Sequence, residues 1–248
     1  MGVIDELEIT LVAVLFGLAD DLRKAGHIVH TLDLFAGHIF NDLAQGMKFV
    51  NGLGVAEAMM RGEQAVQTLP RDLVYAGFAL GVLPAQKPAQ TRFGARGALF
   101  VSSCTPVAAF GLAWPPHLPV PIYAIEADPI FVGDGDSEAA RDLIAQAVYG
   151  ELLLYPGNQH LFMDSSLPVY DAGATALLLS RVLAFLAAIE HAVCANSATA
   201  KRTNHSIRSK ISIFCYNICV AKGATWWSSH YVLQRRWVCD RNDQAIKQ

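Results

Sequence analysis

A tight turn between a strand and a helix is the feature of this sequence with the clearest chemical meaning. The apolar run Leu73–Ala76 leads into Gly77-x-Ala79-x-Gly81, and a helical segment continues to Thr91. In this context the central residue stands at a helix N-terminus, where the dipole favours negative charge, and it normally carries a nucleophilic oxygen or sulfur. Here the central residue is Ala79, whose methyl group cannot attack a carbonyl carbon.

The elements around this turn predict an α/β fold. Short apolar runs without polar alternation, separated by helical patterns, are typical of a mostly parallel sheet covered by helices on both faces. We expect strands at His27–Leu34, Leu73–Ala76, Gly97–Ser102, Val120–Ile125 and Glu151–Tyr155, and helices at Leu11–Ala25, Asn41–Gln67, Ala79–Thr91, Ser137–Val148 and Ala172–Ile189. Within the Ala79–Thr91 helix, Pro88 removes one backbone hydrogen bond at a cost of about 3 kcal/mol.

Four segments resemble the dienelactone hydrolase family of the α/β-hydrolases. They are Thr31–Gly37, Ala76–Lys87, Ile125–Val132 and Tyr155–Phe162, and the likeness covers roughly residues 8–190. The resemblance implies an α/β-hydrolase-like fold, with a first strand that is truncated here because Met1–Glu8 holds few strand-forming residues. It also implies hydrolysis of small carboxylic esters or lactones without a cofactor or a metal.

The resemblance carries a triad of nucleophile, acid and histidine onto Ala79, Asp128 and His160, in that chain order. Asp128 and His160 each follow a predicted strand, where catalytic groups collect in open α/β sheets. Asp128 would fix the tautomer of His160, and His160 would take the proton of the nucleophile. A turn-forming role for Asp128 and a solvated loop position for His160 are the alternatives.

The remaining groups of such a site are less clearly marked. The two oxyanion donors are expected at the backbone N–H of Leu80 and in the loop near Ile9, although Glu8 beside it also fits an N-terminal helix charge. His38, Phe78, Phe131 and Phe162 are candidates for lining the substrate pocket, with core packing as the alternative.

Ser102, Ser103 and Cys104 follow a predicted strand without the glycine-flanked turn. We therefore do not assign the nucleophile to any of them.

Charge divides the chain near residue 190. Residues 1–190 hold 10 Lys and Arg against 20 Asp and Glu, and residues 191–248 hold 9 against 2, which together give the net charge of −3. Four of the five cysteines also lie after residue 190. We expect an α/β-hydrolase domain at 1–190 and, at 191–248, an irregular extension that is poorly ordered or non-native.

A zinc site in this extension is one interpretation of its Cys and His residues. Only one closely spaced pair, Cys215 and Cys219, is present, whereas structural zinc sites need paired ligands at both ends. The other candidates are His205, His230 and Cys239. We expect no metal.

The sequence therefore predicts a cytoplasmic protein that acts on a small ester or lactone as a monomer or a homodimer, without nucleic-acid or membrane partners. Its net charge and its acidic N-terminus without a signal sequence favour this location. Because Ala79 replaces the nucleophile, we expect impaired hydrolysis. The alternatives are a non-catalytic pseudoenzyme that binds a small molecule or partner in the former active site, and a decayed gene product.

Overall fold

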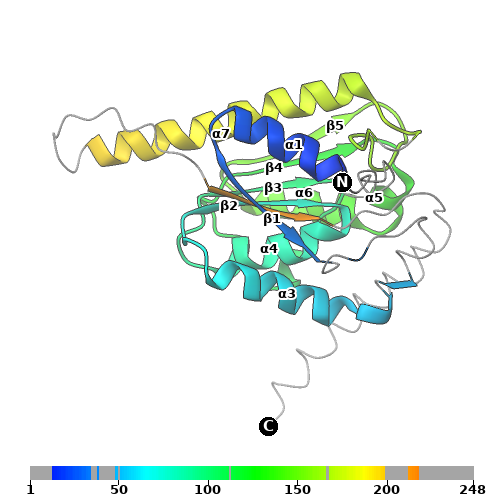
Figure 1. Cartoon of the computed structure of the whole chain (residues 1–248), viewed down its shortest axis with the longest axis horizontal. Helices are drawn as coiled ribbons and strands as arrows, with labels where there is room; N and C mark the ends of the chain where they lie inside the picture. The colour runs from blue at the N-terminus through cyan, green and yellow to red at the C-terminus, as the bar shows by residue number, and fades with distance from the viewer. Residues whose placement is uncertain are drawn as a thin grey trace, which may run out of the picture.

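The computed structural model describes residues 13–34, 38, 48–49, 51–111, 113–165, 168–198 and 212–217. Its architecture is a parallel β-sheet between two layers of helices (Figure 1). The strands are β1 (Ile28–Asp33), β2 (Leu73–Phe78), β3 (Gly97–Val101), β4 (Val120–Ile125), β5 (Gly150–Tyr155) and β6 (Ser212–Asn217). The helices are α1 (Ala13–Lys24), α3 (Val55–Gln67), α4 (Val82–Thr91), α5 (Pro129–Gly133), α6 (Asp136–Gln146) and α7 (Ala172–Ala198), with short 3₁₀ turns at Ala79–Gly81 and Val107–Ala109.

The described strands form one sheet in the order β1-β6-β2-β3-β4-β5, and each neighbouring pair is parallel. The predicted α/β class with a mostly parallel sheet is confirmed. Each predicted strand is found within a few residues of its expected position, and β4 matches the predicted range. Because all strands run the same way, their carboxyl ends lie at one edge of the sheet, where residues distant in sequence meet.

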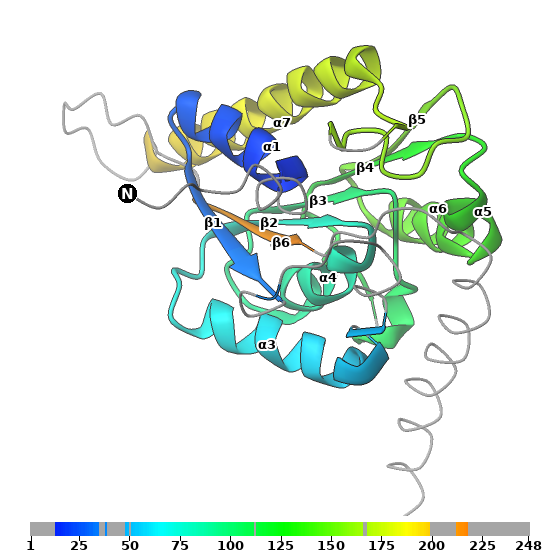
Figure 2. The same cartoon turned by 45° about the vertical axis from the view of Figure 1, so that its right-hand side comes forward.

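Side chains of β2 alternate between two apolar cores, one on each face of the sheet. Leu73 and Tyr75 belong to the core that α3, α4 and α6 cover, whereas Val74 and Phe78 belong to the core that α1 and α7 cover. Figure 2 shows these two helix layers on opposite sides of the strands. A strand that is buried on both faces reads as a continuous apolar run in the sequence, which is why the sheet could be predicted.

The C-terminal segment differs from its prediction in two ways. Helix α7 extends to Ala198, so the predicted domain boundary between residues 190 and 191 falls inside a helix. The sheet also contains β6, which lies between β1 and β2 and pairs with both, although the sequence predicted no strand beyond residue 190. Residues 213–216 form a short apolar run like those of the other strands, but the Cys-, Trp- and Arg-rich residues around them concealed it from prediction.

Pro88 lies in the interior of α4, as predicted, and the helix continues through it. The Arg92 N–H donates to the Pro88 carbonyl at 2.9 Å, which keeps the next turn helical. Because proline has no N–H, the Pro84 carbonyl one turn earlier receives no bond from residue 88. The Pro88 side chain is buried, and its packing offsets part of this loss.

Helix α7 is long and apolar enough to cross a membrane by length and composition, with a mean hydropathy of 1.9 over Ala172–Ala192. It is the one such helix in the part of the chain that the structure describes. Leu178, Val182, Leu186 and Ile189 recur on one side of it and are buried against the sheet. This side of α7 therefore serves as a cover for the sheet.

Candidate active site

The turn after β2 has the geometry that its sequence predicts. β2 ends at Phe78, Ala79 adopts a left-handed backbone with a φ of 47°, and the 3₁₀ turn Ala79–Gly81 continues directly into α4. A left-handed conformation costs an L-residue about 1–2 kcal/mol. Strained residues of this kind cluster at active sites. The strain therefore marks Ala79 as the central residue of the turn, although the residue is only 8% exposed and its methyl group is no nucleophile.

The two glycines of this turn play different roles. A Cβ added to Gly77 would lie 2.5 Å from the Val82 Cα, 2.8 Å from the Gly81 carbonyl oxygen and 2.9 Å from the Ala85 Cβ. No side chain fits at Gly77 because α4 packs directly against the end of β2. Gly81 has an ordinary helical backbone, with φ −64° and ψ −14°, so its backbone angles do not demand glycine.

Asp128 and His160 form the predicted acid–base pair. The His160 Nδ1 lies 2.6 Å from the Asp128 Oδ2, a distance typical of a hydrogen bond that a charge strengthens. The Asp128 side chain is fully buried, whereas 17% of the His160 side chain is exposed. With the carboxylate as acceptor, Nδ1 carries the proton and Nε2 is left as the basic nitrogen.

Asp128 also caps helix α5. Its Oδ1 accepts hydrogen bonds from the backbone N–H of Ile130, at 2.9 Å, and of Phe131, at 3.4 Å. A turn-forming role and a triad role of Asp128 were alternatives in the sequence, and the structure shows that one carboxylate oxygen caps the helix while the other contacts His160. The cap fixes the carboxylate, so the second oxygen is held in place for His160.

The three predicted positions lie at the same edge of the sheet. Ala79 follows β2, Asp128 follows β4 and His160 lies in the loop after β5, and all of these strands are parallel. The arrangement provides a base at His160 Nε2 that can accept a proton from a hydroxyl group or a water molecule. It provides no attacking oxygen at residue 79.

The predicted oxyanion donors are only partly described. Leu80 lies in the first turn after β2, where backbone N–H groups have no partner within the helix. Its position therefore suits an oxyanion donor. Glu8 and Ile9 lie outside the described residues, so the second donor stays a prediction.

The four predicted lining residues lie in different surroundings. Phe131 belongs to the core under α4 and α6, and Phe78 and Phe162 belong to the core under α1 and α7. Each of these three rings is at most 5% exposed. His38 is exposed, with its ring centroid 4.7 Å from that of Phe49. Core packing accounts for the three phenylalanines, and a substrate contact by any of the four stays a prediction.

Three residues after β3, which sequence analysis set aside as nucleophiles, have distinct environments. Ser103 donates a hydrogen bond to the Asp136 carboxylate at 2.6 Å. Cys104 is a fully buried thiol in the apolar core, with its Sγ 3.7 Å from the Thr105 carbonyl oxygen. Ser102 is buried and has a left-handed backbone with a φ of 59°. The sequence contains no glycine pattern from which this conformation of Ser102 could have been predicted.

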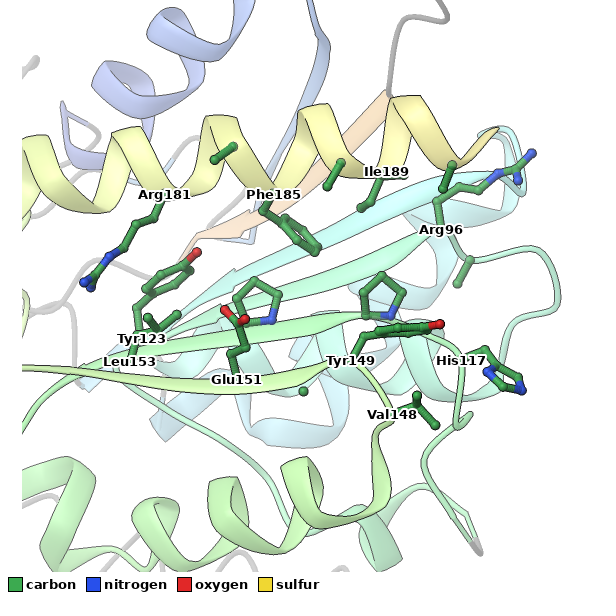
Figure 3. A pocket seen from close by; sticks show the side chains of 17 residues that line it. Arg96, His117, Tyr123, Val148, Tyr149, Glu151, Leu153, Arg181, Phe185 and Ile189 are labelled. Atoms are coloured by element: carbon green, nitrogen blue, oxygen red, sulfur yellow. The ribbon is translucent and has the colours of Figure 1, made fainter. Parts of the chain in front are cut away.

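A separate cavity of about 1110 Å³ lies between α7 and the sheet (Figure 3). Its lining includes none of the three triad positions. Tyr123, Glu151, Phe185 and the apolar side of α7 line it, and the Arg181 guanidinium at one end lies 5.1 Å from the centre of the Tyr155 ring. Burial raises the pKa of the Tyr123 phenol, and the nearby Tyr155 and Glu151 raise it further. Because Ala79, Asp128 and His160 do not line it, the cavity is distinct from the sheet edge at which these three residues lie.

Metal binding has no support in the described part of the chain. No group of three or more His, Cys, Asp or Glu residues is close enough there to hold an ion. Of the predicted zinc candidates, Cys215 lies in β6, and His205, Cys219, His230 and Cys239 lie outside the described residues.

Comparison with known proteins gives no relative for this chain. No family model, no curated protein and no solved structure matches it.

Proposed function

We propose that this chain is an α/β-hydrolase-type protein of the dienelactone hydrolase kind, which binds small carboxylic esters or lactones and hydrolyses them poorly because Ala79 replaces the nucleophile. The observation that carries the proposal is the Asp128–His160 pair, with its 2.6 Å contact, at the same sheet edge as the strained turn at Ala79. A buried carboxylate that fixes a histidine at the same sheet edge as such a turn has the arrangement expected for the acid–base part of an acyl-transfer site.

The proposal gives each group a function. In a chain with serine at residue 79, His160 Nε2 would take the hydroxyl proton while the oxygen attacks the ester carbon, and the N–H of Leu80 would stabilise the resulting oxyanion. With Ala79, His160 can only activate a water molecule. Removal of the nucleophile from a comparable triad costs roughly a millionfold in turnover and leaves about 10³–10⁴ over the reaction in water.

The direct test restores the missing atom. We expect Ala79→Ser and Ala79→Cys to hydrolyse p-nitrophenyl acetate and a small lactone such as dihydrocoumarin, at rates far above those of the unmodified chain. Ala79→Gly is the matched control, because it changes the same strained position without supplying a nucleophile. His160→Ala combined with Ala79→Ser should abolish the gain.

Two results would contradict the proposal. A folded Ala79→Ser variant without any esterase activity would mean that Asp128 and His160 do not serve this turn. Substantial activity of the unmodified chain that His160→Ala removes would mean that the nucleophile lies elsewhere.

The methyl group of Ala79 favours one second function, that of a non-catalytic binding protein. In this case the unmodified chain binds a small ester, lactone or carboxylic acid and releases it unchanged. Isothermal titration with a slowly hydrolysed lactone, followed by chromatography of the recovered ligand, separates binding from turnover.

A further inference from the structure

Ser102 lies beside Ala79 at the carboxyl edge of the sheet. Phe78 at the end of β2 is paired with Val101 at the end of β3, so Ala79 and Ser102 are the next residues of two adjacent parallel strands. Neighbouring strands are about 5 Å apart. Both residues are left-handed, with φ 47° and 59°. Two adjacent strands therefore end in the same strained conformation at the same level of the sheet.

The Ser102 hydroxyl is buried without a hydrogen-bond partner among the described residues. The residue is 1% exposed, and its Oγ contacts neither solvent nor an acceptor or donor. Its backbone N–H donates to the Tyr123 carbonyl at 2.8 Å, which ties the residue to β4. The next hydroxyl along the chain, that of Ser103, has a partner in Asp136. Ser102 therefore differs from Ser103 because its hydroxyl group has no hydrogen-bond partner among the described residues.

Ser102 destabilises the fold in two ways. A buried hydroxyl without a partner loses its hydration and gains no bond in return. A left-handed backbone is strained for serine, and glycine would relieve that strain. Alanine at this position would remove the unpartnered hydroxyl, and glycine would remove both the hydroxyl and the backbone strain. A residue that weakens the fold twice at the edge where ligands collect is best explained by a contact with a ligand.

We propose that the Ser102 hydroxyl is a ligand-binding group of this site, which donates a hydrogen bond to a carbonyl or carboxylate oxygen of a small ester, lactone or carboxylic acid. The choice of ligand class rests on the proposed function. The neighbouring Leu80 N–H, at the start of the helix after β2, offers a second donor for the same carboxyl group. Ser102 lies between the turn at Ala79 and Asp128 after β4, so a ligand there is within the catalytic edge.

Helix α4 holds the segment after Ser102 in place. The buried Gln86 amide donates to the Thr105 carbonyl at 2.6 Å and accepts from the Thr105 N–H at 2.9 Å. One turn later, Gln90 donates to the Val107 carbonyl at 2.8 Å. These bonds fix the segment after Ser102 to the same helix that begins at the turn of Ala79, so the two positions are held relative to each other. Because the Ser102 oxygen is closed to solvent, we expect binding to require movement of the groups that cover it.

The test uses the full chain with Ala79→Ser, in which turnover reports on the site. We expect Ser102→Ala and Ser102→Gly each to lower kcat/KM for p-nitrophenyl acetate by about 3- to 10-fold, the range for one lost hydrogen bond. Both should also weaken inhibition by benzoate by a similar factor. The thermal midpoint should stay the same or rise, because the strained or unpartnered groups are removed.

Ser103→Ala is the matched control, since it removes the adjacent hydroxyl and its bond to Asp136. We expect the opposite pattern, a lower thermal midpoint with unchanged kcat/KM and unchanged benzoate inhibition.

The inference is overturned if both Ser102 variants keep kcat/KM and the inhibition constant, or if both lower the thermal midpoint as Ser103→Ala does. Failure of the proposed function is recognised separately, by an Ala79→Ser variant that folds and has no activity. The Ser102 proposal is then decided by titration of the unmodified chain with benzoate. A dissociation constant about 3- to 10-fold higher in Ser102→Ala supports it, and an equal constant or no binding refutes it.

Discussion

Gly77→Ala tests whether the turn at Ala79 is as tight as the structure shows. The added methyl carbon would stand 2.5 Å from the Val82 Cα, 2.8 Å from the Gly81 carbonyl oxygen and 2.9 Å from the Ala85 Cβ. Carbon atoms in good contact are about 3.5–4.0 Å apart. Two of these neighbours are backbone atoms, so no side-chain rotation can make room and α4 must move away from β2.

The size of the effect follows from what α4 contributes. Val82, Ala85 and Ala89 of this helix are buried in the core beneath the sheet, so a shift of α4 opens that core. Overpacking of a well-packed core costs about 1–3 kcal/mol. The change from glycine to alanine restricts the unfolded chain and returns about 0.4–1 kcal/mol. We therefore expect the free energy of unfolding to fall by about 1–2 kcal/mol.

Urea unfolding, followed by far-UV circular dichroism, measures this change. Gly17→Ala is the control, because Gly17 is an exposed residue of α1 and a Cβ there would meet no atom within 4 Å. In a helix interior this control should gain up to about 1 kcal/mol. A Gly77→Ala variant as stable as the Gly17→Ala control would refute the argument that β2 and α4 meet too closely for a side chain.

Two further predictions concern other parts of the fold. Burial lowers the pKa of His27, and the nearby Glu190 carboxylate, 3.6 Å away, opposes this only in part. The unfolded chain therefore binds the proton more readily than the folded chain, so the free energy of unfolding should fall as the pH drops below about 6.5. His27→Gln should flatten this acid dependence of the urea midpoint, and an unchanged profile would show that other groups cause it. Truncation after Ala198 removes β6 and leaves the facing edges of β1 and β2 unpaired. Because each lost hydrogen bond costs about 0.5–1.5 kcal/mol, the free energy of unfolding should fall by several kcal/mol. A truncated chain of equal stability would instead show that the extension is dispensable, as its composition suggested.

The sequence alone determined the class of the fold and the order of the three candidate catalytic positions. A strand buried on both faces must be apolar throughout, so β2, β3 and β4 were visible as short hydrophobic runs. The glycine at residue 77 is a local requirement of a close strand–helix contact, so the turn at Ala79 was also visible. Asp128 and His160 could be placed because each follows such a strand.

Only the tertiary structure decided the features that depend on contacts across the sheet. β6 lies between β1 and β2, and this position depends on pairing with strands that are distant in sequence. The predicted boundary after residue 190 falls inside α7, which covers the sheet and continues to Ala198. The left-handed backbone of Ser102 has no glycine to reveal it, and its unpartnered hydroxyl is a property of the space around it.

The contacts of the Asp128 carboxylate depend both on the local sequence and on the tertiary structure. Its position before Pro129 is a local signal, and from it the sequence predicted either a turn or a triad acid. The fold alone brings His160 to the second oxygen, 32 residues further along the chain, while the first oxygen caps α5. Local patterns fix which groups stand at the ends of strands, because they reflect burial and backbone geometry. Which of those groups touch depends on the packing of strands and loops that are distant in sequence.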